Sequence, residues 1–225
     1  QALKSGSVDE SSSKYGLPTG LSEYMVECTA EQKPLFLLAL LLEHNTNEND
    51  ISVVFTSSLD STHRLARLLQ ILWKESKIGE SSDVVEYSSA LNQTQRTNLV
   101  QRCNTTGIRV VVCSDGLSRG MDIPSVSTVI NYDVPAFAKT YVHRCGRTAR
   151  AGRQGRAVSL LKGGQIRQFL KMRKLIDDSQ QVVKTTVKKE LIRDTFSVYK
   201  SCITKLKDVM QAEEDGDLNP IDPIQ

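Results

Sequence analysis

The sequence predicts an α/β domain in which a mostly parallel β-sheet is covered by helices on both faces, followed by a C-terminal helical extension. Three observations support this fold class. Short β-rich runs alternate with helical runs between residues 21 and 176, as in successive βαβ units. Several of the β-rich runs are almost continuously apolar, as strands buried on both faces are. The helical runs place their apolar residues on one face.

The first half of the chain begins this alternation. Residues 24–28 are predicted to form a strand, and residues 31–44 a helix in which Pro34 is tolerated because it lies in the first turn. The apolar run 51–56 is predicted to be a buried strand. Residues 61–73 are predicted to be helical, since their leucines recur at spacings of three and four.

The same pattern continues with a strand at 84–87, a helix at 93–103, a second apolar strand at 108–113 and a strand at 128–132. Because the chain alternates between strand and helix, these strands are expected to run parallel. In such sheets ligands bind outside the carboxyl ends of the strands, which is where the polar motifs described below begin.

In the C-terminal half, residues 138–142 begin a helix that leads into an arginine-rich stretch. A strand at 156–161 and a helix at 165–176 follow. A further helix is predicted at 188–211. It has an apolar stripe at spacings of four and three, which we expect to pack back on the domain rather than to bind a partner. The stripe consists of Ile192, Phe196, Tyr199, Ile203, Leu206 and Met210.

Composition divides the chain into four parts. Residues 1–16 are rich in Ser and Gly and are expected to be a flexible linker, and residues 17–180 form the α/β domain. Residues 181–212 form the helical extension. Residues 213–225 are acidic, so we expect a disordered tail.

Length and composition exclude several classes of protein. The chain has 225 residues, of which 39% are hydrophobic and 24% charged, as in an ordinary globular protein. No apolar run is long enough to span a bilayer, and no membrane partner is expected. The five scattered cysteines contain no C-x-x-C pair, which argues against a disulfide framework or a zinc site and fits a reducing compartment. We expect no bound structural metal.

Charge is distributed unevenly, although the net charge is only +3. No acidic residue occurs between Asp133 and Asp177, whereas basic residues are frequent there. Such a one-sided block creates a local positive potential that suits phosphate groups.

Residues 143–150, with the sequence His-Arg-Cys-Gly-Arg-Thr-Ala-Arg, are the most informative segment of this block. Three arginines recur at a spacing of three, here called the arginine array: Arg144, Arg147 and Arg150. A planar guanidinium binds phosphate or carboxylate oxygens two at a time and keeps its charge near pH 7. Without other signals, a solvated basic helix face would be the simpler interpretation.

Four neighbouring segments strengthen the functional interpretation: 52–58, 93–96, 113–124 and 129–135, which read SVVFTSS, QTQR, CSDGLSRGMDIP and VINYDVP. In this order and spacing, together with the arginine array, they resemble the motifs of the second RecA-like domain of DEAD-box RNA helicases. The resemblance covers residues 17–175. It implies a RecA-like parallel sheet and RNA-dependent ATP hydrolysis.

The resemblance implies roles for the arginine array in ATP hydrolysis. Arg147 and Arg150 match the arginine fingers that reach the γ-phosphate, and they are the expected catalytic residues. Asp122 matches the aspartate that accepts hydrogen bonds from the ribose hydroxyls. Ala149 stands where glycine is usual. We expect the backbone there to have no positive φ, so that the methyl group is tolerated.

Three further residues match positions that line the cleft between the two domains of such helicases or shape its loops. His143 and Arg144 are expected to line the cleft and to couple it to RNA, with Arg144 in a structural rather than catalytic role. Arg119 is expected to orient the loop that carries Asp122. No metal ligand is assigned in this chain.

The resemblance also implies contacts to RNA. Ser58, Arg96 and Ser114 match residues that bind the RNA backbone, and Ser58 doubles as a candidate helix N-cap. The family commonly has a glycine near Ser89, so a contact there is less certain. Contacts of this kind position RNA without reading its sequence.

Motifs for the rest of the reaction are missing: the chain has no G-x-x-x-x-G-K-[ST] loop and no Asp-Glu-Ala-Asp. In the family, ATP and Mg²⁺ are held mainly by the N-terminal RecA-like domain. We therefore expect this chain to be the C-terminal part of a longer protein, with that domain and RNA as its partners. Alone it should neither hydrolyse ATP nor unwind RNA.

Two alternative classes fit the sequence less well. A DEAH-type or RecQ-like branch is disfavoured by His143, since those branches usually begin this motif with glutamine. A non-catalytic RNA-binding scaffold on the same fold is disfavoured by the presence of Arg147, Arg150 and Asp122. Within the DEAD-box family, residues 54–58 and 140–152 look most like a nucleolar subgroup that acts in assembly of the large ribosomal subunit. This implies pre-ribosomal RNA, assembly factors and a nuclear, nucleolar location; a cytoplasmic location is the alternative.

Overall fold

The computed structural model describes residues 16–44, 47, 50–105, 107–115, 123, 126–176 and 181–224. Its centre is a seven-stranded sheet in the order β3-β4-β2-β5-β6-β1-β7, and every neighbouring pair is parallel. The strands are β1 (Leu21–Glu27), β2 (Ile51–Thr56), β3 (Val84–Tyr87), β4 (Val110–Ser114), β5 (Val126–Asn131), β6 (Gly155–Leu161) and β7 (Val183–Thr185).

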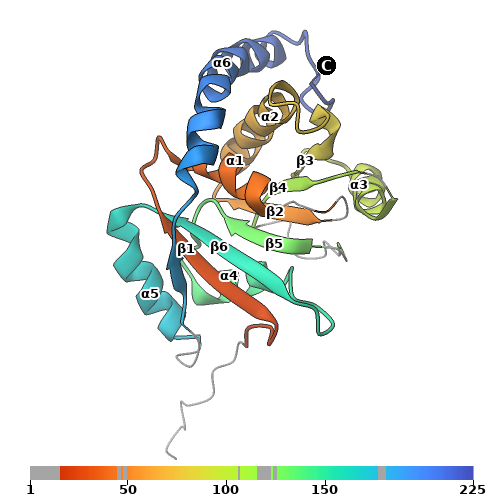
Figure 1. Ribbon diagram of the computed structural model, residues 1–225. Coiled ribbons are helices and arrows are strands. Elements are labelled where there is room, and N and C mark those ends of the chain that lie inside the picture. Colours follow the sequence, from red (N-terminus) through yellow and green to blue (C-terminus); the bar gives the residue numbers. More distant parts are fainter. Residues whose placement is uncertain are drawn as a thin grey trace, which may run out of the picture.

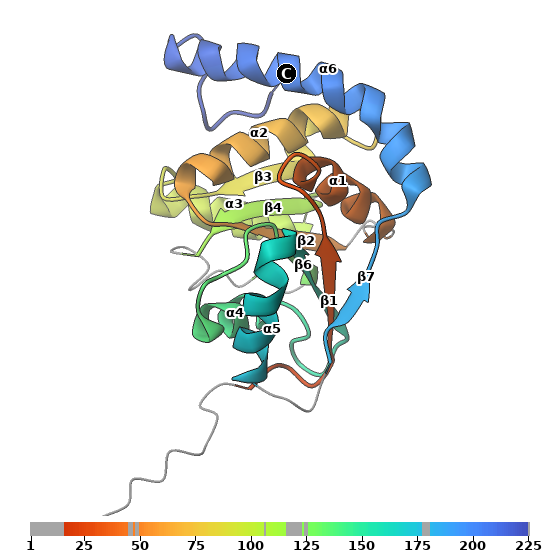
Figure 2. The same cartoon turned by 90° about the vertical axis from the view of Figure 1, so that its left-hand side faces the viewer.

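Helices cover both faces of this sheet (Figures 1 and 2). One apolar cluster joins the sheet to α1 (Lys33–His44), α2 (Leu59–Glu75) and α6 (Lys189–Glu214). Two clusters on the other face join it to α3 (Gln93–Thr105), and to α4 (Ala138–Cys145) and α5 (Ile166–Lys174). Two short 3₁₀ turns, η1 (Ser81–Asp83) and η2 (Gly163–Gln165), precede β3 and α5.

The predicted fold class is confirmed, and most predicted elements differ from the observed ones only at their ends. The strands at 51–56 and 84–87 have the predicted bounds, since each is a short, mostly apolar and β-branched or aromatic run. Strand β7 was not predicted. It has only three residues and lies at the sheet edge with two of them exposed, so it has no apolar alternation to reveal it.

Helix α6 begins one residue later and ends three residues later than predicted. It packs against α2 and α1, and Figure 2 shows it lying across α2 as an outer layer. Most of its apolar stripe contacts the core, as predicted. Phe196 is an exception, because 45% of its surface is exposed. No helix among the described residues is both long enough and apolar enough to cross a membrane.

The expected disorder after Glu213 is wrong for the residues that the structure describes. The chain turns at Gly216, where φ is +81°, and residues 218–224 return along α2; we call this segment the C-terminal strap. Arg67 of α2 donates to the carbonyl oxygens of Asn219 and Asp222, at 3.0 and 2.6 Å. The strap is therefore held through its main-chain carbonyl groups, and composition does not predict such bonds.

Candidate nucleotide and RNA site

The carboxyl ends of three central strands bring the predicted motifs together. Ser57 and Ser58 follow β2, Asp115 follows β4, and Asp133 comes shortly after β5. These strands are neighbours in the order β4-β2-β5, so the three loops lie side by side at one edge of the sheet. This is the position where open parallel sheets bind ligands.

Arg144 of α4 ties these loops together from a buried position, with only 1% of its surface exposed. Its Nε and Nη2 donate to the two carboxylate oxygens of Asp115 at 2.5 and 2.8 Å. Its Nη1 donates to Oδ1 of Asn131 at 3.0 Å and to the carbonyl of Asp133 at 2.5 Å. The guanidinium also lies over the ring of Phe55, 5.0 Å from its centroid. A side chain so fully engaged organises the site and is not placed to reach a phosphate.

Arg147 and Arg150 differ from Arg144 because both are only partly buried. Their Nε atoms donate to main-chain carbonyls four residues earlier, those of His143 at 3.3 Å and Gly146 at 2.8 Å. These bonds restrain each guanidinium at its Nε. Less side-chain conformational entropy is therefore lost when a ligand binds.

The charge of the array extends to the end of β4. Burial raises the pKa of the Cys113 thiol well above its usual range, while the positive charges of Arg144 and Arg147 act in the opposite direction.

The expectation that the backbone at Ala149 has no positive φ is wrong. Its φ is +54°, and Ala151 has a φ of +53°. The chain leaves α4 through a left-handed turn rather than a continued helix, which is why glycine is favoured at such positions. Ala149 is accommodated because its neighbour Gly155 has no side chain; a Cβ there would lie 2.5 Å from the main-chain nitrogen of Ala149.

The predicted RNA contacts lie on two helix starts and one strand end. Ser58 is the N-cap of α2, and its Oγ accepts from the main-chain nitrogen of Ser61 at 3.1 Å. Ser114 is the buried last residue of β4.

Arg96 lies in the first turn of α3, where its Nη2 donates weakly to the carbonyl of Ser89 at 3.4 Å. Its Nε is buried and has no hydrogen-bond partner. The rest of the side chain is only half-buried, so its guanidinium charge remains near the surface.

Two predicted residues, Arg119 and Asp122, lie outside the described residues. Among the described residues, no group of three or more His, Cys, Asp or Glu side chains could hold a metal ion.

Sequence reasoning missed several residues that shape the site. Lys33 contacts Asp133 across 100 residues of chain, and no local pattern marks that pairing. On the far side of α4, Tyr141 and Arg173 both donate to the buried carboxylate of Glu23. No local pattern marks this second network, because β1 also contains Ser22 and Glu27 and the burial of Glu23 depends on tertiary packing.

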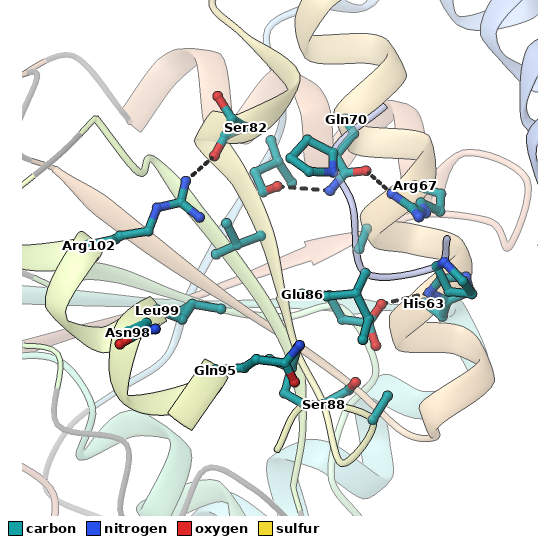
Figure 3. Close-up of a pocket in the computed structure, with 18 residues that line it drawn as sticks. His63, Arg67, Gln70, Ser82, Glu86, Ser88, Gln95, Asn98, Leu99 and Arg102 are labelled. Atoms are coloured by element: carbon teal, nitrogen blue, oxygen red, sulfur yellow. Dashed lines mark hydrogen bonds and ion pairs between the residues drawn. The ribbon is translucent and has the colours of Figure 1, made fainter. Parts of the chain in front are cut away.

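Away from this edge, a pocket of about 250 Å³ lies over the outer edge of β3, between α2, α3 and the C-terminal strap (Figure 3). His63 of α2 crosses one side of it. Its Nδ1 is 2.7 Å from Glu86 of β3 and its Nε2 is 2.7 Å from Glu213 of α6. None of the predicted site residues lines this pocket.

A parallel sheet with helices on both faces and an arginine-bearing helix at its carboxyl edge defines a RecA-like domain. The structure is similar to E. coli DEAD-box protein SrmB bound to regulator of ribonuclease activity A, with a TM-score of 0.61, 30% identity, and coverage of 76% of this chain and 93% of that one. It also has the fold of S. cerevisiae Dbp5 bound to RNA and ADP BeF3, with a TM-score of 0.62 over 84% of this chain and 46% of that one.

Sequence comparison gives the same assignment. Residues 32–152 match the model of the helicase conserved C-terminal domain. The chain is 39% identical over 202 residues to DEAD-box ATP-dependent RNA helicase 1 of Arabidopsis thaliana, covering 89% of this chain and 37% of that protein. It is 33% identical over 209 residues to ATP-dependent RNA helicase DDX51 of Mus musculus, covering 92% of this chain and 31% of that protein.

The chain therefore belongs to the helicase conserved C-terminal domain family, in its DEAD-box branch. It spans about a third of the length of these relatives.

Proposed function

We propose that the chain is the half of an RNA-dependent ATPase that completes the active site when two RecA-like domains close on ATP and RNA. Arg147 and Arg150 act as arginine fingers on the γ-phosphate, and Asp122 accepts from the ribose. Most of the site for ATP and Mg²⁺ belongs to an N-terminal domain. In this proposal the chain alone neither hydrolyses ATP nor unwinds RNA.

The proposal rests on a difference in burial within the arginine array. Arg144 is saturated with bonds inside the domain, whereas Arg147 and Arg150 lie partly exposed on the turn that follows the same helix. One arginine thus anchors the segment on which the other two are presented. Charge that spreads over the γ-phosphate oxygens in the transition state would be stabilised by such fixed cations.

RNA would be held along the β2–α2 loop and the start of α3. Ser58 presents the N-terminus of α2, Arg96 offers a half-buried guanidinium, and Ser114 adds a hydroxyl at the end of β4. These are backbone contacts without base readout. Closure of the two domains would bend one RNA strand and separate a short duplex locally, and hydrolysis would reopen the cleft.

The biological setting belongs to the proposal as well. The motifs at 54–58 and 140–152 favour a nucleolar enzyme that acts on pre-ribosomal RNA with assembly-factor proteins. Fluorescence microscopy of the tagged full-length protein tests this: nucleolar signal is expected, and an exclusively cytoplasmic signal would contradict it.

The decisive experiment measures RNA-stimulated ATP turnover by the full-length parent and its Arg150→Ala variant, with Arg153→Ala as the matched control three residues on. Arg150→Ala should reduce turnover by about 10³-fold or more and leave nucleotide-free RNA binding nearly unchanged. Arg153→Ala should retain turnover. An unaffected Arg150→Ala variant would refute the finger assignment, and an inert parent would favour the scaffold alternative.

A further inference from the structure

Lys33, the first residue of α1, has a buried ammonium group at the candidate site, with 5% of the residue exposed. Its Nζ donates to the carbonyl of Tyr132 at 2.5 Å and to Oδ1 of Asp133 at 2.9 Å. It also lies 4.8 Å from the centroid of the Tyr132 ring. A buried ammonium is unfavourable unless it is paired, so this geometry specifies one partner, the Asp133 carboxylate.

Asp133 in turn connects two parts of the site. Its Oδ2 accepts from the main-chain nitrogen and the hydroxyl of Ser57, at 3.1 and 3.2 Å. Its main-chain carbonyl accepts from Arg144 at 2.5 Å. The loop that leads into the N-terminus of α2 and the helix that carries the arginine array are thus both fastened to one residue.

The position of this carboxylate raises an electrostatic problem for RNA. Asp133 binds Ser57, the neighbour of Ser58, and Ser58 caps the helix start that is suited to a phosphate. A negative charge beside that start would repel the phosphate. Lys33 supplies the opposite charge, with its Nζ 2.9 Å from Oδ1 of Asp133. Ser57 binds the other carboxylate oxygen, Oδ2, so both contacts can exist together.

We propose that Lys33 tunes RNA binding at the start of α2: it neutralises Asp133, the residue that holds the Ser57–Ser58 loop in register with Arg144. The inference rests on the proposed function, because it needs RNA phosphate at the start of α2. Lys33 itself touches neither RNA nor ATP.

The test uses the full-length parent with a single-stranded homopolymeric RNA and measures ATP turnover across RNA concentration. Lys33→Met should raise the half-saturating RNA concentration about tenfold, as expected for the loss of one coupled charge pair. The maximal turnover at saturating RNA should change far less than this concentration. Lys74→Met, which removes an exposed lysine from the last turn of α2, controls for the loss of one positive charge.

A second substitution separates neutralisation from a merely structural role. Asp133→Asn keeps an acceptor for Ser57 but removes the charge, so Lys33→Met/Asp133→Asn should return the half-saturating RNA concentration to within about threefold of the parent. Asp133→Asn alone, which leaves the ammonium uncompensated, should bind RNA at least as well as the parent. If Lys33→Met is too unstable to assay, these last two variants still test the prediction.

Two results would overturn the inference: an unchanged half-saturating RNA concentration for Lys33→Met, or no recovery in the double variant. The proposed function is judged separately by Arg150→Ala. If Arg150→Ala abolishes turnover while Lys33→Met behaves as the parent, the arginine fingers stand and only the role of Lys33 fails.

Discussion

Arg67 and Glu213 lie 146 residues apart in the sequence, yet Nε of Arg67 donates to Oε1 of Glu213 at 2.6 Å inside the protein. Their side chains are only 2% and 4% exposed. This pair fastens the end of α6 to the middle of α2 and turns the chain into the C-terminal strap.

Glu213→Ala should lower the free energy of unfolding by about 3–5 kcal/mol, because it leaves the Arg67 guanidinium buried without its counter-charge. The adjacent, exposed Glu214 provides the control, and Glu214→Ala should change stability by no more than about 0.5 kcal/mol. Urea denaturation of the two variants measures both values. Equal effects would mean that the pair does not stabilise the fold.

Stability should depend on pH through His63. Hydrogen bonds to Glu86 and Glu213 raise the pKa of His63 above its ordinary 6.5, although partial burial opposes them. A raised pKa in the folded state stabilises the protein fully below about pH 6.5, and this contribution is lost as the pH rises through the folded pKa.

His63→Gln should remove that dependence. The difference in free energy of unfolding between parent and variant should be largest near pH 6 and should shrink towards pH 9. Taking the difference cancels the contribution of His44, whose pKa is lowered chiefly by burial and which therefore acts in the opposite direction. A difference that grows with pH would contradict the assigned direction.

Gly155→Ala should destabilise the turn behind the arginine array. The new Cβ would lie 2.4 Å from Oγ1 of Thr148 and 2.5 Å from the main-chain nitrogen of Ala149, so the backbone would have to move. We expect a loss of about 1–3 kcal/mol in stability. Gly164→Ala meets nothing within 4 Å and should be neutral or slightly stabilising, which thermal melting of both variants checks.

Arg144→Lys should be far from conservative. A lysine cannot reproduce the bidentate bond to Asp115 together with the bonds to Asn131 and the Asp133 carbonyl. The unpaired buried groups should cost about 1–3 kcal/mol of stability. Arg167→Lys, on the exposed face of α5, is the control and should melt with the parent.

The elements and the place of the site follow from local pattern, because strand–helix alternation and polar residues after strands are properties of short segments. The strand at 51–56 and the helix at 93–105 are examples. The partners of buried charges do not follow, since the Lys33–Asp133 and Arg67–Glu213 pairs join residues 100 and 146 positions apart in the sequence. Their existence depends on tertiary packing.

The predictions for the Ala149 backbone and for the strap were wrong for different reasons. The left-handed backbone at Ala149 could not be inferred from a run of residues that also suits a helix. The strap was expected to be disordered because it lies in the acidic segment 213–225. It is ordered by Arg67 and Ser81 binding its main-chain carbonyls, and every residue type has such a carbonyl.

The strap also has a bearing on how this domain behaves in isolation. Strand β3 closes one end of the sheet, and its outer edge is a template on which another strand could form. The strap and the end of α6 lie over that edge. Ser81, just before β3, donates to the carbonyl of Ile224 in the strap. Glu86 of β3 is bridged through His63 to Glu213 of α6. A fragment that ends before α6 would uncover it, because it lacks both α6 and the strap. Such a fragment would be prone to edge-to-edge aggregation, whereas one that extends to residue 224 keeps its own cover.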